Sequence, residues 1–196
     1  MEPAFHLSLS VGGLLASLLL VTVGHELGHL LVARALHIPV RYIAVGLGPT
    51  LWRCGLTDGL RLEVRLVPVS MAVGLAARWS TAGRGHRPLQ QDIAVAAGGP
   101  LANFLMALAL VAFLIFARPG PAAQAWCMGT AVLSSLLALY NLIPLPGLDG
   151  GHLLILGAAS LGLKLSPQRE AMLHRVGLRL TATVCMFLLA ARLAAL

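Results

Sequence analysis

The stretch LLLVTVGHELGHLLV, from Leu18 to Val32, decides the fold because it sets three ionisable side chains inside an otherwise apolar run. The run extends from about residue 7 to residue 36, which exceeds the roughly 20 residues that an α-helix needs to cross a bilayer. An ionisable residue within a membrane span is costly and as a rule is kept for function. The stretch therefore predicts a membrane helix that carries a functional site.

The ionisable residues are His25, Glu26 and His29, in the pattern HExxH. Positions four apart share one face of a helix, so both imidazoles can bind one metal ion while Glu26 lies beside an open coordination position. The alternative is a polar stripe that hydrogen-bonds neighbouring helices. Three ionisable residues within five positions favour the metal site, with zinc as the expected ion.

The composition of the chain favours a membrane protein over a soluble one. Hydrophobic residues make up 58% of the 196 residues and charged residues 11%, whereas a soluble domain carries roughly 25% charged residues. The balance of 14 basic against 7 acidic residues could suggest binding to nucleic acid. The basic residues fall in the gaps between apolar runs, however, where anionic lipid and membrane topology account for them. We therefore expect the lipid bilayer as a partner and no nucleic acid.

The fold class expected is an α-helical membrane protein with about four transmembrane helices, in a single integral-membrane domain of residues 1–196. The four apolar runs cover approximately residues 7–36, 93–117, 122–142 and 176–196. Ser166 is the expected N-cap of the last helix, ahead of Pro167. The shorter apolar stretch from Leu153 to Leu163 is expected to form a half-helix or an interfacial segment.

The distribution of basic residues predicts the orientation. The loops that follow the first and third spans carry most of them, whereas the N-terminus has none and the turn between the second and third spans has only Arg118. Because basic loops stay on the cytoplasmic side, both termini are expected outside and the site toward the cytoplasm. We expect the membrane to be that of a bacterial cell.

The first cytoplasmic loop predicts a membrane-associated β-hairpin within residues 40–75. Residues Leu60–Leu66 alternate strictly between apolar and charged side chains, which is typical of a strand with one wet face. Asp58–Gly59 is a strong turn signal, and Thr50–Arg53 is the expected partner strand.

A catalytic zinc ion usually has three protein ligands, and the third is expected to be Asp149. The other carboxylates after the motif lie in aqueous loops or at the start of the second span. Asp149 falls within NLIPLPGLDGGH, from Asn141 to His152, whose prolines and glycines exclude a regular helix throughout. Irregular backbone at membrane depth is tolerated where it lines a cavity, so Asp149 can face the two histidines. The alternative is an ordinary Asp-Gly turn.

These motifs together resemble the site-2 protease family, whose members are intramembrane zinc metalloproteases. The resemblance rests on HELGH in the first span, on Gly99–Asn103 (GPLAN) in the second and on Asn141–Gly150 (NLIPLPGLDG) in the third. The loop Gly46–Pro49 and the segment Val67–Gly74 resemble that family's membrane-associated β-element, although the segment departs from the usual PxGG-like sequence. The resemblance covers nearly the whole chain.

The resemblance implies that His25, His29 and Asp149 bind Zn²⁺ and that Glu26 is the catalytic base. It also implies that Asn103 and Asn141 hold the backbone of the substrate, and that the chain is a minimal form without a PDZ or CBS domain. The implied substrate is a single-pass transmembrane protein, such as an anti-sigma factor, a precursor transcription factor or a remnant signal peptide.

Three other interpretations of the sequence are less favoured. A non-enzymatic membrane zinc carrier or sensor could use the same ligands, but it has no need for Glu26. A structural helix assembly with a degenerate site is disfavoured because every expected catalytic position is occupied. A membrane peptidase of the soluble-zincin type needs a Glu as third ligand, and the only later candidates, Glu63 and Glu170, are poorly placed.

Overall fold

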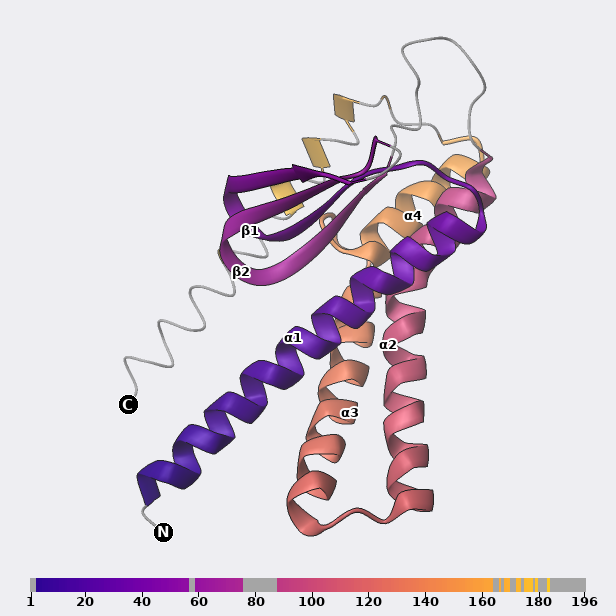
Figure 1. Ribbon diagram of the computed structural model, residues 1–196. Coiled ribbons are helices and arrows are strands. Elements are labelled where there is room, and N and C mark those ends of the chain that lie inside the picture. The colour runs from indigo at the N-terminus through magenta and orange to yellow at the C-terminus, as the bar shows by residue number, and fades with distance from the viewer. Residues whose placement is uncertain are drawn as a thin grey trace. The chain divides into compact units, whose positions relative to one another are not determined.

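The computed structural model describes residues 3–56, 59–75 and 88–163, together with single residues and short pieces between 166 and 183. Contacts divide the chain into two compact units, Met1–Leu139 and Tyr140–Leu196. The elements in chain order are α1 (Pro3–Ala35), β1 (Val40–Gly55), β2 (Arg61–Leu75), α2 (Leu89–Ala117), α3 (Pro121–Asn141) and α4 (Asp149–Ser160) (Figure 1).

Helices α1, α2 and α3 are each long and apolar enough to cross a membrane, which confirms the first three predicted spans. Helix α1 ends before His37, which adopts a left-handed backbone (φ 55°), and before Pro39, which cannot continue the hydrogen-bonded ladder. Arg118, also left-handed (φ 45°), is the C-cap of α2. Most of the predicted fourth span, 176–196, lies outside the described residues, but its expected N-cap is present: the backbone N–H of Arg169 donates to Ser166 Oγ over 3.4 Å.

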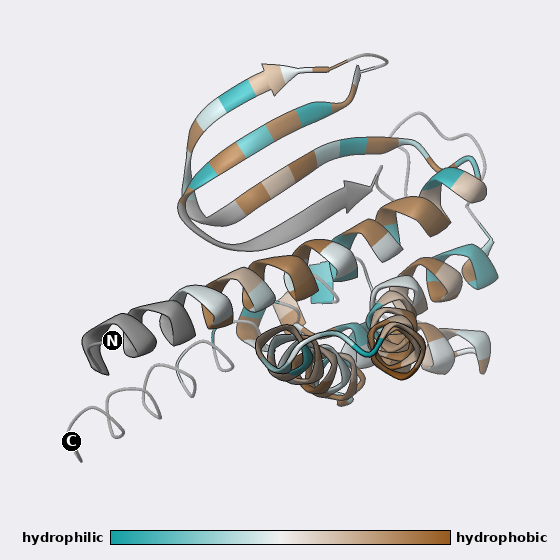
Figure 2. Ribbon diagram, turned by 60° about the horizontal axis from the view of Figure 1, so that its bottom comes forward, coloured by the Kyte–Doolittle hydropathy of each residue, from teal (hydrophilic) through white to brown (hydrophobic). Residues whose placement is uncertain are grey.

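The surface of the helices is apolar, as a bilayer requires. Large hydrophobic side chains are exposed along all three helices. Examples are Leu31, Leu108 and Leu136, which are 66%, 65% and 58% exposed. In Figure 2 much of the helix ribbon is brown, the colour of hydrophobic residues, whereas the coloured parts of the strands alternate between hydrophilic teal and hydrophobic brown. Lipid tails would cover these helix faces, so the chain is an integral membrane protein with three candidate spans among its described residues.

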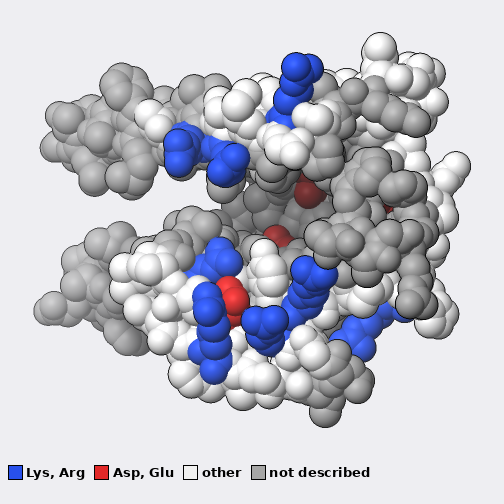
Figure 3. Space-filling view, turned by 90° about the horizontal axis from the view of Figure 1, so that it is seen from above, with Lys and Arg blue, Asp and Glu red and all other residues white. Residues whose placement is uncertain are grey.

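The predicted hairpin between the first and second spans is confirmed, and its strands fill the expected region from Val40 to Leu75. The expected partner strand is also confirmed, with Arg53 opposite Glu63 and Trp52 opposite Val64. Gly59, at the turn, has a φ of 76°, which only a residue without a Cβ adopts at no cost. Glu63 forms ion pairs with Arg53 and Arg65 on one face of the sheet. Figure 3 shows several basic side chains on the face of the molecule seen from above.

The register of the sheet shows which strand segments form its edges. Ala44, in the first half of β1, lies opposite both Ala72 and Glu63, so this half has neighbours on both sides. Glu63, in the first half of β2, lies opposite both Ala44 and Arg53 and is also internal. Among the described residues, the edges are therefore the second halves of the two strands, residues 50–55 and 71–75.

A small buried cluster joins the sheet to the helices that carry the site. It consists of Ala33 on α1, Ile38 and Val40 after it, Leu60 before β2 and Val95 on α2, all at 8% exposure or less. The cluster lies one turn beyond His29 along α1. Burial of these apolar groups therefore holds the end of α1 against α2 at the level where the histidines lie.

The second unit begins with the last two residues of α3 and continues through an irregular segment into α4. Residues 142–148 form no helix or strand, and Gly147 has a φ of 103°. Asp149 is the first residue of α4 rather than part of the irregular backbone. Gly150 and Gly151 pack so closely against the Leu142 and Leu145 carbonyls that a Cβ on either would overlap them. The glycines that suggested a break in the helix are thus needed for close packing at its start.

Candidate metal centre

His25 and His29 lie one above the other on α1 and direct the same ring atom toward each other. Their Nε2 atoms are 3.3 Å apart, and the rings meet edge to face with centroids 4.9 Å apart. His25 is 5% exposed, within the membrane-spanning part of the helix. Two imidazole nitrogens that converge in this way can share one metal ion.

His29 is held in the tautomer that a metal ligand needs. Its Nδ1 lies 2.7 Å from the backbone carbonyl oxygen of Val95 on α2. Because a carbonyl oxygen can only accept, Nδ1 must carry the proton and donate it. The lone pair on Nε2 is then available, and the ring is fixed in orientation, as is usual for metal-binding histidines.

His25 has its contact on the opposite ring nitrogen. Its Nδ1 lies 3.2 Å from the side-chain amide of Asn103 on α2, which is fully buried at 0% exposure. The backbone carbonyl of Asn103 accepts a hydrogen bond from Ser134 Oγ on α3 over 2.9 Å. Helices α2 and α3 thus both contribute to the surroundings of His25.

Glycines let α2 approach α1 at the level of the histidines. A Cβ built on Gly99 would overlap the Nε2 atoms of both His25 and His29, and one on Gly28 would overlap the carbonyl oxygen of Gly98. Both helices therefore meet backbone to backbone here. The space in front of the two Nε2 atoms exists because residue 99 has no side chain.

The remaining predicted residues lie as follows. Glu26 is partly exposed on α1, between the two histidines in sequence. In the second unit, Asn141 and Asp149 are partly exposed, at the end of α3 and the first position of α4. Sequence reasoning identified His25, His29 and Asn103 but missed the Val95 carbonyl and Gly99. The pair Gly98–Gly99 inside a span was a usable signal of close helix approach.

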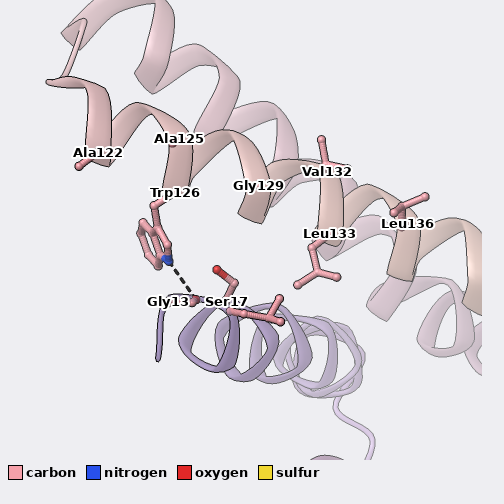
Figure 4. A pocket seen from close by; sticks show the side chains of 10 residues that line it. Gly13, Ser17, Ala122, Ala125, Trp126, Gly129, Val132, Leu133 and Leu136 are labelled. Atoms are coloured by element: carbon pink, nitrogen blue, oxygen red, sulfur yellow. Dashed lines mark hydrogen bonds between the residues drawn. The ribbon is translucent and has the colours of Figure 1, made fainter. Parts of the chain in front are cut away.

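A large cavity elsewhere in the first unit does not contain these residues. It has a volume of about 570 Å³ and lies between α1 and α3, lined mainly by Gly, Ala and Leu. Trp126 Nε1 donates to the Gly13 carbonyl at one end (Figure 4), and Ser17 shares a 2.7 Å hydrogen bond with Thr130. Its apolar lining lies within the spans, where lipid or a neighbouring helix would cover it.

Comparison with known proteins gives a consistent family. The sequence model described as Peptidase family M50 matches residues 13–130 and 117–184. Zinc metalloprotease RasP of Oceanobacillus iheyensis is 46% identical over 52 residues, 26% of this chain and 12% of that protein. Protease RseP of Yersinia pestis is 31% identical over 98 residues, 46% of this chain and 22% of that protein. The chain thus aligns with less than a quarter of the length of either curated relative.

A solved structure shares the fold. The Site-2 Protease from Methanocaldococcus jannaschii superposes with a TM-score of 0.55 over 92% of this chain and 68% of that one, at 20% identity. At this identity the likeness concerns the fold alone. The family model, in contrast, matches well over half of the sequence, and the chain therefore belongs to peptidase family M50.

Proposed function

We propose that this protein is an intramembrane zinc metalloprotease that hydrolyses peptide bonds in or near the transmembrane segments of other membrane proteins. The observation that carries the proposal is the convergence of His25 Nε2 and His29 Nε2, 3.3 Å apart within a membrane span. Membership of a peptidase family supports hydrolysis as the reaction, and the apolar surroundings support a substrate that lies in the bilayer.

The donor atoms fit zinc. Two neutral imidazoles and one carboxylate are a ligand set that catalytic zinc sites use, and His25, His29 and Asp149 are a group of that composition that could hold a metal ion. We propose Asp149 as the third ligand because the other described carboxylates have other roles or positions. Glu26 is the proposed base, Asp92 lies in the first turn of α2, and Glu63 is ion-paired in the sheet.

The chemistry then follows from the residues. A bound zinc ion lowers the pKa of coordinated water and polarises a scissile carbonyl. Glu26, between the two ligands, is proposed to accept the proton of the attacking water and to return it to the leaving amine. Asn141, at the end of α3, offers an amide that can hydrogen-bond the backbone of an unwound substrate. We place this site toward the cytoplasm, with both termini outside, because the basic loops lie on its side of the spans.

Removal of the metal tests the proposal. Purified protein in detergent micelles should contain about one zinc ion per chain and should cleave a single-pass transmembrane substrate. A chelator should abolish both signals, and zinc should restore both. The Asp149→Ala variant should bind zinc more weakly, whereas Asp92→Asn should leave the zinc content unchanged. Cleavage that persists after the zinc has been removed would exclude the proposed mechanism.

The edge of the sheet is proposed to capture the unwound substrate. A helix hides its amides in internal hydrogen bonds, and an added β-strand exposes the substrate backbone for attack. Residues 50–55 form one edge among the described strands, whereas the first half of β2 is internal. The N–H of Leu56 bonds the Leu60 carbonyl. The pairing is regular from Gly55 to Trp52, so by alternation the N–H of Arg53 points outward.

Proline at position 53 is a direct test of this edge. The Arg53→Pro variant removes an outward donor without removing a backbone bond of the hairpin, and cleavage should fall by roughly tenfold, the value of one hydrogen bond of about 1.4 kcal/mol. The Arg53→Ala variant, which keeps the N–H and loses the same ion pair with Glu63, is the matched control. Equal cleavage by the two variants, with zinc content unchanged in both, would exclude this edge as the docking strand.

A further inference from the structure

The geometry around His25 points to a positioning residue, Asn103, whose side-chain amide selects the tautomer in which His25 can bind zinc. The inference rests on the proposed metal site and adds a role that differs from substrate binding. It depends on the juxtaposition of the Asn103 amide with His25 Nδ1, and of His25 Nε2 with His29 Nε2.

The contacts form a chain from α2 through both histidines and back to α2. Val95 O fixes the proton of His29 on Nδ1, so His29 Nε2 can only accept. In the 3.3 Å contact, His25 Nε2 is therefore the donor. The Nδ1 of this His25 tautomer accepts, and Asn103 Nδ2, 3.2 Å away, donates to it. Every donor in this arrangement faces an acceptor.

Ligation of a metal requires the other tautomer of His25. A neutral imidazole binds zinc through an unprotonated nitrogen, so the proton of His25 must lie on Nδ1 when Nε2 is the ligand. That Nδ1–H would face the N–H group of Asn103, donor against donor. A half-turn of the amide exchanges Nδ2 for Oδ1 and converts the clash into an Nδ1–H···Oδ1 hydrogen bond.

The present position of Oδ1 agrees with this exchange. The oxygen is buried and meets no donor among the described residues, so it loses no hydrogen bond when the amide turns. The turn gives Oδ1 the His25 contact and moves Nδ2 to the position that Oδ1 held. One amide atom is therefore hydrogen-bonded before and after the turn, while His25 Nε2 is released for the metal.

The surroundings hold Asn103 in place through its backbone. The Asn103 backbone carbonyl accepts from Ser134 Oγ over 2.9 Å, and the side chain has 0% exposure. Helix packing by Ser134 uses the backbone of residue 103 and does not depend on its amide. A substrate cannot contact a fully buried side chain without a rearrangement of α1 and α2, which favours the role toward His25 over the role in substrate binding.

Zinc affinity separates a positioning role from the alternatives. The full chain in detergent is titrated with zinc against a fluorescent chelator, for the wild type, Asn103→Leu and Asn103→Asp. Asn103→Leu removes the acceptor and should weaken zinc binding by roughly 10–100-fold, as loss of an outer-shell partner does. Asn103→Asp keeps an acceptor at the same distance and should bind zinc as tightly as the wild type or more tightly.

The matched control is Thr130→Val, which removes another fully buried polar group of the first unit, one that bonds Ser17 away from the histidines. It should leave zinc affinity unchanged. A second measurement, ¹⁵N NMR of labelled histidines, should show the His25 proton on Nδ1 in the zinc-loaded wild type and in Asn103→Asp.

The outcomes divide cleanly between the two proposals. Wild-type protein that binds no zinc would overturn the metal site and this inference with it. Tight wild-type binding with unchanged affinity in Asn103→Leu would overturn the inference alone, as would equal losses in Asn103→Leu and Asn103→Asp or in Asn103→Leu and Thr130→Val. A higher KM with unchanged zinc affinity in Asn103→Leu would assign the amide to the substrate.

Discussion

The Glu26→Gln variant should lose proteolytic activity by about 10²–10⁴-fold while it keeps its zinc, because loss of a general base has effects of that size. Glutamine preserves the shape of the side chain but cannot take the proton of the attacking water. His25 and His29, which flank Glu26 on α1, are unchanged in this variant. The measurement pairs single-turnover cleavage of a transmembrane substrate with the zinc content of the same preparation.

The control for this experiment is Glu63→Gln, which changes a carboxylate of the same kind in β2, where it pairs with Arg53 and Arg65. It should retain zinc and most of the activity. Undiminished cleavage by Glu26→Gln would contradict the assigned base, and undiminished biological activity without cleavage would favour a zinc carrier or sensor. Loss of zinc from Glu26→Gln would instead place Glu26 among the ligands.

The Gly99→Ala variant should lose zinc binding, although it adds only one methyl group. The new Cβ would overlap both Nε2 atoms that face the metal position. Relief requires α2 to move away from α1, which the contact of Gly28 with Gly98 opposes at the adjacent turn. We expect zinc affinity to fall by at least the roughly 10–100-fold that outer-shell changes cause, with activity lost in parallel.

Gly129→Ala is the matched control because Gly129 also lies in a membrane-spanning helix, α3, and a Cβ there meets nothing within 4 Å. This variant should bind zinc normally and should be at least as stable as the wild type, since alanine is the better helix former. Normal zinc affinity in Gly99→Ala would show that the helices separate easily, and the steric argument for the site would then be wrong.

The sequence predicted the parts of this molecule that depend on local pattern. Long apolar runs predicted four spans, of which three are confirmed among the described residues. The alternation of residues 60–66 predicted a strand and the spacing of His25 and His29 predicted their convergence, and these two depend on periods of 2 and 3.6 residues along the chain. The Ser166 N-cap, confirmed by its bond from Arg169, is local in the same sense.

The features that sequence reasoning missed depend on contacts between segments far apart in the chain. Nothing near Ala44 indicates that it lies between two halves of β2, because register is set by pairing. The Val95 carbonyl is invisible in the sequence, since every residue has one, and only packing of α2 on α1 brings it to His29. The start of α4 at Asp149 was missed because glycines were taken as helix breakers, whereas here they permit close packing.

The backbone contact of Gly28 with Gly98 is the point about which α1 and α2 can change their crossing angle. When a bilayer of different thickness changes the tilt of the spans, two helices whose backbones approach most closely at one level rotate about that level. Gly12, at the far end of the apolar part of α1, is about 24 Å from Gly28 at 1.5 Å per residue, so a tilt change of about 10° displaces it by about 4 Å. His25 and His29 lie within one helical turn of Gly28, so the same change of tilt hardly moves them. Lipid thickness therefore acts on the distant ends of the helices and leaves the spacing of the two imidazoles intact.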